Sequence, residues 1–130
     1  MRVISRIPLF AGCSGAELAR IASITVQTDL PTGELLTREG ERGEEFFVLV
    51  KGTAEVRKGK RQIDSLKAGD FLGEMALLTD APRMATVRAT SPVTVLRASR
   101  RGFSELLDTS PGIQRKVRKA LADRLAPTAL

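Results

Sequence analysis

The strongest constraint on the fold is a central stretch, residues 26–99, in which short apolar runs alternate with breaks that carry glycine or proline. The runs are 46–50, 53–57, 61–66, 85–89 and 93–98, and the breaks include Lys51-Gly52, Lys58-Gly59-Lys60 and Thr90-Ser91-Pro92. The run 46–50, Phe-Phe-Val-Leu-Val, consists of residues that favour strands. The two runs on either side of Lys58-Gly59-Lys60 are typical of a hairpin. Several short strands at close spacing predict a barrel or sandwich with antiparallel pairing.

Helical patterns lie on both sides of this stretch. Ser14 and Glu17 have the spacing of a capping box, and the apolar residues that follow predict a helix at about 14–24. Arg100 to Leu107 carries its apolar residues on one side. Ser110-Pro111 is a typical helix start, and we expect this last helix to end at Pro127. The length of 130 residues predicts one domain, 1–130, with a helical part at 1–25, the strands at 26–99 and C-terminal helices at 100–126.

Missing residue types exclude several kinds of chemistry. The chain has no His, which excludes His-based acid–base catalysis and His-ligated zinc. Its single cysteine, Cys13, cannot form an internal disulfide or a paired-cysteine metal site. Cys13 is either a small residue that fills a loop or a thiol with its pKa lowered by the helix that follows. Dispersed carboxylates suggest no metal site. No apolar run approaches the ~20 residues of a membrane span, and no secretory signal is visible.

Positive charge gathers at the C-terminal end of the chain. The net charge is +6, and residues 97–124 hold eight basic against three acidic side chains. Such asymmetry is found in proteins with phosphate-rich partners, but it also fits a solvated helix face. Two further readings remain open: a residue of this face that reaches a bound ligand, or a contact surface for a partner domain.

The segment 71–87 has the parts of a cradle for a sugar phosphate. Gly73 permits an unusual backbone turn, after which residues 74–78 form one helical turn whose first N–H groups favour an anion. Arg83, nine residues after Glu74, has a planar guanidinium that matches phosphate oxygens. Glu74 can accept hydrogen bonds from sugar hydroxyls. The alternative is an ordinary turn with a surface Arg–Glu pair, which adds little stability.

This segment closely resembles the phosphate-binding cassette, here residues 72–87, of the cyclic nucleotide-binding domain family, which includes protein kinase A regulatory subunits, the catabolite activator protein and cyclic-nucleotide-gated channels. The matching residues are Phe71-Leu72-Gly73-Glu74-Met75-Ala76-Leu77 and Pro82-Arg83-Met84-Ala85-Thr86-Val87. A second family pattern, upstream, is present as Gly40, Glu41, Gly43, the apolar residues 46–49 and Gly52. The resemblance covers essentially the whole chain. It implies a mainly β fold, a β-roll or double-stranded β-helix of jelly-roll type with N- and C-terminal helices.

The resemblance also implies a role for each site residue. Arg83 would pair with the exocyclic oxygens of the cyclic phosphate, and Glu74 would accept the ribose 2′-hydroxyl. Backbone N–H groups of Met75, Ala76 and Ala85 would surround the phosphate, and Gly73 would give close access. Three residues would line the base pocket: Val56, Leu66 and Leu72. Met84 departs from the family pattern, in which Thr or Ser follows the Arg when guanine is recognised. Because Met84 has no hydroxyl, the sequence favours cAMP over cGMP.

The expected function is therefore that of a cytoplasmic regulatory module. It binds a cyclic nucleotide, with cAMP preferred over cGMP, and does not change it chemically. No catalytic residue, metal or cofactor is expected. Binding would move the C-terminal helices, which an effector domain or protein would contact. Three alternatives stay open: a DNA-binding regulator, a regulatory part of a larger enzyme, transporter or channel, and a β-roll that has lost its ligand. DNA binding is disfavoured because we expect no helix-turn-helix before Leu130, and a membrane partner is also not expected.

Overall fold

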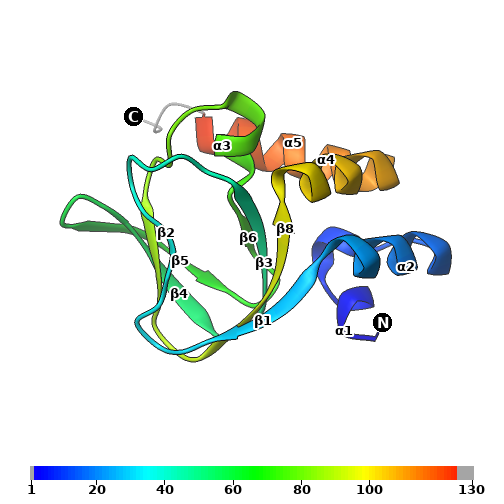
Figure 1. Ribbon diagram of the computed structural model, residues 1–130, viewed down its shortest axis with the longest axis horizontal. Coiled ribbons are helices and arrows are strands. Elements are labelled where there is room, and N and C mark those ends of the chain that lie inside the picture. Colours follow the sequence, from blue (N-terminus) through cyan, green and yellow to red (C-terminus); the bar gives the residue numbers. More distant parts are fainter. Residues whose placement is uncertain (1, 126–130) are drawn as a thin grey trace.

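The computed structural model describes residues 2–125, and its strands form two four-stranded antiparallel sheets. One sheet has the order β1-β8-β3-β6 and the other β2-β7-β4-β5 (Figure 1). The strands are β1 Val26–Leu30, β2 Leu35–Thr37, β3 Glu45–Lys51, β4 Thr53–Lys58, β5 Arg61–Lys67, β6 Phe71–Leu72, β7 Thr86–Ala89 and β8 Val93–Ser99. The helices are α1 Arg2–Ser5, the 3-10 helix η1 Pro8–Phe10, α2 Gly15–Ile24, α3 Glu74–Thr79, α4 Arg100–Thr109 and α5 Pro111–Leu125. The predicted β-roll with flanking helices is confirmed.

The local patterns of the sequence correspond to elements of the structure. Ser14 and Glu17 form both hydrogen bonds of the capping box at the start of α2, at 3.1 and 2.8 Å. The Ser110 hydroxyl accepts a hydrogen bond from the Gly112 N–H at 3.1 Å, so Ser110 caps α5 as predicted. The predicted hairpin is β4–β5. Pro127, where we expected α5 to end, lies outside the described residues.

Strand β3 is buried on both faces. Phe46 and Val48 belong to a core shared with the helices, whereas Phe47 and Leu49 belong to a core between the two sheets. Successive side chains of a strand point to opposite faces, so a run without polar residues fits a strand covered on both sides. This explains why 46–50 is the most apolar run of the chain.

Four short elements were not predicted from the sequence: α1, η1, β2 and β6. Each has at most four residues, too few to establish a periodicity. The runs 85–89 and 93–98 also behave in a way that the sequence did not indicate. They are consecutive strands, β7 and β8, but they lie in different sheets, with residues 90–92 crossing between them.

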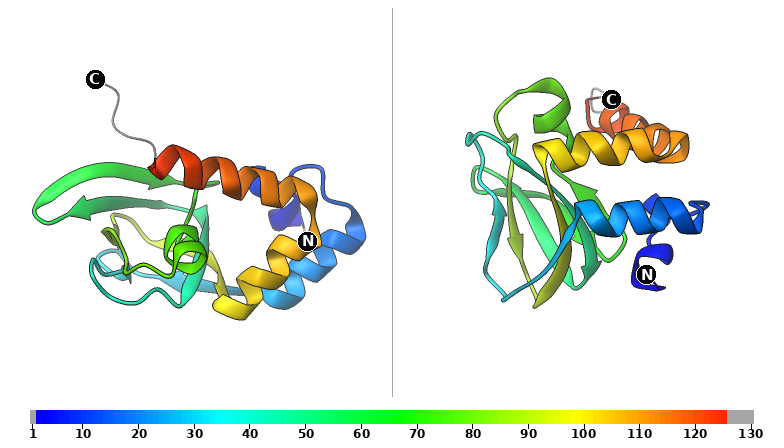
Figure 2. Two further views of the ribbon diagram at one scale, coloured as in Figure 1. Left: turned by 90° about the horizontal axis from the view of Figure 1, so that it is seen from above. Right: turned by 45° about the vertical axis from the view of Figure 1, so that its right-hand side comes forward.

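The helices gather on the outer side of the sheet that contains β3 and β8 (Figures 1 and 2). Their core includes Phe10 from η1, Ile21 from α2, Leu106 from α4 and Ile113 with Val117 from α5. Helix α5 runs back so that its C-terminal part lies beside α3 (Figure 2). Within residues 2–125, no helix is long and apolar enough to cross a lipid bilayer.

Candidate functional site

A cavity of about 270 Å³ opens between the β4–β5 hairpin and the segment that follows β6. Nine of the ten residues predicted for the site line it: Val56, Leu66, Leu72, Gly73, Met75, Ala76, Arg83, Met84 and Ala85. The remaining lining residues are Thr37, Ile63, Asp64 and Val87. One wall is apolar and comes from strands of both sheets, while the other consists of α3 and the loop after it. The tenth predicted residue, Glu74, is fully buried in the first turn of α3 and does not line the cavity.

Gly73 makes the turn between β6 and α3. Its backbone has φ +100° and ψ −10°, a conformation that side chains rarely permit. A Cβ at this position would lie 2.6 Å from the Glu45 carbonyl oxygen and 2.9 Å from Nη1 of Arg83. Gly43 is similarly confined, because its Cβ would lie 2.8 Å from Cζ of Arg83. The two glycines therefore make room for the Arg83 guanidinium.

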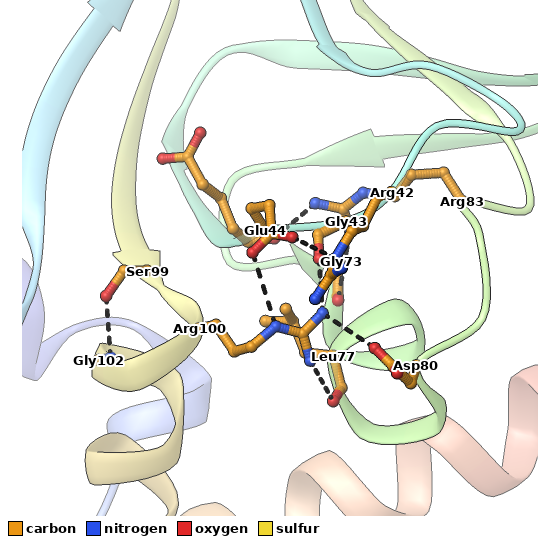
Figure 3. Close-up of polar contacts among 11 residues, drawn as sticks. Arg42, Gly43, Glu44, Gly73, Leu77, Asp80, Arg83, Ser99, Arg100 and Gly102 are labelled. Atoms are coloured by element: carbon orange, nitrogen blue, oxygen red, sulfur yellow. Dashed lines mark hydrogen bonds and ion pairs between the residues drawn. The ribbon is translucent and has the colours of Figure 1, made fainter.

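Arg83 is buried, with 9% of its surface exposed, and its side chain is held by backbone carbonyls. Nη2 donates to the Glu45 carbonyl oxygen at 2.6 Å and Nη1 to the Gly73 carbonyl oxygen at 3.3 Å (Figure 3). The Arg83 backbone also pairs with the loop before β3, at Gly40 and Glu41. Burial lowers the pKa of Arg83 and Glu45 opposes this shift, yet a guanidinium keeps its charge at neutral pH. A cation is thus fixed at the edge of the cavity.

Because Arg83 and Glu74 are both buried, the alternative of a surface Arg–Glu pair is wrong. The reactive-thiol alternative for Cys13 finds no support either. The pKa of the Cys13 thiol is raised, chiefly because the thiol is partly buried. Cys13 fits the other interpretation, a small residue that fills a loop.

Arg100 joins three segments around the site, and no pattern in the sequence pointed to this role (Figure 3). It is the first residue of α4, and it donates to the carbonyl oxygens of Gly43 at 2.9 Å and Leu77 at 3.3 Å. Its guanidinium also forms ion pairs with Glu44 at 3.6 Å and Asp80 at 3.4 Å. Arg100 therefore connects the start of the C-terminal helices with α3 and with the loop beside Arg83. In the sequence it was only one member of the basic stretch.

Comparison with known proteins agrees with this geometry. The sequence model of the cyclic nucleotide-binding domain matches residues 27–110, which include the cavity and Arg100. The chain belongs to the cyclic nucleotide-binding domain family.

Individual relatives of this cyclic nucleotide-binding domain are regulatory proteins and a channel. The cAMP-dependent protein kinase regulatory subunit of Mycosarcoma maydis is 41% identical over an alignment of 116 positions, and the match covers 82% of this chain and 22% of that protein. A cyclic nucleotide-gated potassium channel of Rhizobium etli is 33% identical over 123 residues, 95% of this chain and 34% of the channel. The domain thus spans about a third or less of these relatives.

A solved structure of Sp-2Cl-cAMPS bound to PKAR CBD2 has the same fold. It superimposes with a TM-score of 0.78 at 28% identity and covers 97% of this chain and 90% of that one. The two sheets, the cassette between β6 and β7 and the C-terminal helices described above are therefore the architecture of the family.

Met84 and Ile63 form the outer part of the cavity of this cyclic nucleotide-binding domain. Both line the cavity and are largely exposed, at 46% and 52%. The sequence singled out Met84 but neither Ile63 nor Asp64. The structure adds Asp64 because it lies opposite Val56 in the regular part of the β4–β5 pairing. It adds Ile63 at the irregularity that follows, where Arg57 pairs with Gln62. No group of three or more His, Cys, Asp or Glu side chains suited to a metal is found among the described residues.

Proposed function

We propose that this domain binds cAMP in the cavity and acts as a regulatory module. The observation that carries the proposal is the buried Arg83 guanidinium at the edge of a cavity with an apolar wall. A cyclic phosphate carries one negative charge and would lie against this cation, with the purine on Val56, Leu66 and Leu72. Charge-assisted bonds from a guanidinium to phosphate are among the stronger hydrogen bonds in proteins.

The fixed position of Arg83 supports the assignment of the phosphate site. Two of its five N–H donors point to backbone carbonyls, at Glu45 and Gly73. The guanidinium is thus oriented before a ligand arrives, and other donors are available to an anion. Burying a cation is costly, and a bound phosphate would compensate for that cost.

The choice of cAMP rests on the residues around the base pocket and on the relatives. Met84 offers no hydroxyl for the edge of a guanine. The relative from Mycosarcoma maydis is the regulatory subunit of a protein kinase that is described as cAMP-dependent. We further infer that the ligand is bound without chemical change, because the relatives are kinase regulatory subunits and a channel.

The output would pass from the cassette to the C-terminal helices. Arg100 binds the Leu77 carbonyl of α3 and the Gly43 carbonyl of the loop, so a shift of α3 toward a ligand changes the contacts of α4. A ligand displaces such an equilibrium only through its different affinity for the two states. An effector domain or protein that contacts α4 and α5 would respond to the movement of these helices.

The deciding experiment is isothermal titration of the purified chain with cAMP and cGMP, with Arg83→Leu alongside. We expect cAMP to bind and Arg83→Leu to weaken it about 100-fold or more, because removing one partner of a buried charge pair costs 2–5 kcal/mol or more. Arg101→Leu is the matched control, since the Arg101 side chain is 91% exposed. Equal cAMP affinity in Arg83→Leu and wild type would contradict the site. If neither nucleotide binds, the proposed function is wrong and the domain is a β-roll that has lost this ligand.

Glu74 has a separate test. Glu74 does not itself line the cavity, but its neighbours Gly73 and Met75 do, and the family resemblance assigns it the ribose 2′-hydroxyl. We therefore expect Glu74→Ala to lower the affinity for cAMP and to reduce the preference for cAMP over its 2′-deoxy analogue. Titration of both nucleotides into both proteins measures this difference. A preference that is unchanged in Glu74→Ala would remove Glu74 from the ribose site.

A further inference from the structure

Among the described residues one acidic residue, Asp64, lines the cavity, and the proposed function gives it no role. Asp64 and Arg83 are the only charged residues among the described residues that line the cavity. Arg83 belongs to the cassette side, whereas Asp64 lies on β5, in the hairpin that projects beyond the rest of the barrel (Figures 1 and 2). The remaining lining residues of this hairpin are Val56, Ile63 and Leu66, which are apolar.

The strand register places Asp64 on the base side of the cavity. Asp64 is opposite Val56, and Leu66 is opposite Ala54. Residues opposite each other in an antiparallel pair project from the same face of the sheet. Asp64 therefore shares a face with Val56 and Leu66, the residues assigned to the base pocket.

The carboxylate is also oriented and open to a ligand. Oδ1 of Asp64 accepts a hydrogen bond from the Ser65 N–H at 2.8 Å, which restricts the rotation of the side chain. Asp64 is exposed, and within the described part of the chain it forms no ion pair. Two carboxylate oxygens have about four acceptor sites, so one backbone bond leaves acceptors free for a ligand.

We propose that Asp64 determines base specificity by accepting a hydrogen bond from the amino group at position 6 of adenine. An ionised carboxylate accepts and never donates, and the N6 amino group is the hydrogen-bond donor on the adenine edge. At the same position guanine has a carbonyl oxygen, an acceptor that a carboxylate repels, and the donors of guanine, N1–H and the 2-amino group, lie farther along the edge of the base. The inference rests on the proposed function, because it requires the phosphate to lie at Arg83. The hydrogen bond to Asp64 would favour adenine directly, whereas Met84 only lacks the hydroxyl that would contact guanine.

The test compares three nucleotides: cAMP, cGMP and the 3′,5′-cyclic monophosphate of purine riboside, which lacks the amino group. Each is titrated into wild type, Asp64→Leu and Asp64→Asn. Because a hydrogen bond to a charged group is stronger than one between neutral groups, we expect cAMP affinity to fall about 10- to 100-fold in Asp64→Leu. The loss should be smaller in Asp64→Asn, which keeps an acceptor oxygen. The affinity for the purine analogue should not change, and cGMP should bind more tightly to Asp64→Leu than to wild type.

Controls separate this inference from the proposed function. Glu34→Gln removes one negative charge outside the cavity and should leave all three affinities unchanged, and circular dichroism with thermal unfolding checks that each variant folds. If wild type binds none of the three nucleotides, the proposed function fails and the inference fails with it. If wild type binds cAMP and Asp64→Leu binds it equally well, the role of Asp64 alone is overturned. The same holds if the purine analogue loses as much affinity as cAMP, because Asp64 would then contact a part of the nucleotide other than the amino group.

Discussion

At the scale of single residues, backbone carbonyl oxygens hold two guanidinium groups around the site. Arg83 donates to the carbonyls of Glu45 and Gly73, and Arg100 to those of Gly43 and Leu77. The carboxylates of Glu44 and Glu45 are close enough to raise the pKa of Arg83, against the lowering by burial and by Arg100. Arg100 is compensated by its ion pairs with Glu44 and Asp80. Among the described residues Arg83 is the one cation that lines the cavity, and a phosphate would neutralise it.

Gly73→Ala tests how much the turn before α3 depends on glycine. We expect a loss of about 1–3 kcal/mol in the free energy of unfolding, because alanine would be strained at φ +100°. The added Cβ would also push on the Glu45 carbonyl and on Arg83, so cAMP affinity should fall as well. Urea denaturation and isothermal titration measure the two effects. Gly15→Ala is the control, because no atom lies within 4 Å of the added Cβ and the φ of Gly15 is not positive. If Gly73→Ala is as stable as Gly15→Ala, the prediction is wrong.

At the scale of elements, the outer face of the β4–β7 pair carries an ion-pair cluster. Glu55 of β4 accepts from Nε of Arg57 on the same strand at 2.9 Å and lies 3.3 Å from Nη2 of Arg88 on β7. The hydrogen bond from Arg57, together with the charges of both arginines, lowers the pKa of Glu55 below its usual 4.5. The cluster lies opposite the cavity wall, because Val56, the next residue of β4, lines the cavity.

This cluster predicts a pH dependence of stability. With its pKa lowered in the folded state, Glu55 contributes stability above the unfolded pKa of about 4.5, and the contribution is lost as pH falls through the folded pKa. We expect Glu55→Gln to be less stable than wild type at pH 7. The difference should shrink toward pH 3, measured by urea denaturation between pH 3 and 7. A difference that stays constant over this range would contradict the prediction.

At the scale of the whole molecule, the terminal helices are joined by a lysine. Nζ of Lys116 on α5 donates to the carbonyl oxygens of Pro8 at 2.8 Å and Ala11 at 3.3 Å, around η1. In the sequence Lys116 was only one of the eight basic residues between 97 and 124. In the structure it connects the two ends of the chain, across 108 residues.

Lys116→Met tests this connection. We expect a loss of about 1 kcal/mol in the free energy of unfolding, the net value of a typical hydrogen bond, because the site is partly exposed. Amide hydrogens at residues 10–13 should exchange faster, as measured by hydrogen exchange with mass spectrometry. Lys119→Met, on the exposed side of α5, serves as the control. If both variants exchange alike, Lys116 does not hold η1.

Features that depend on neighbouring residues could be predicted from the sequence. The capping box at Ser14, the cap at Ser110, the β4–β5 hairpin and the apolar β3 each follow from the hydrogen bonds or burial of a few consecutive residues. The cassette could also be predicted, since its glycine, acid and arginine lie within ten residues of one another. Six of the seven site residues predicted within 73–85 line the cavity for this reason, whereas Val56, Leu66 and Leu72 were expected there only from the family resemblance.

Only the tertiary structure decided which distant segments meet. It placed β7 and β8 in different sheets, brought Arg100 onto the Gly43 carbonyl 57 residues away, and made Asp64 part of the cavity lining by pairing it with Val56 of β4. None of these contacts has a local cause. Each depends on how the two sheets and the helices share their cores, and that arrangement is fixed by packing over the whole chain rather than by any short run of residues.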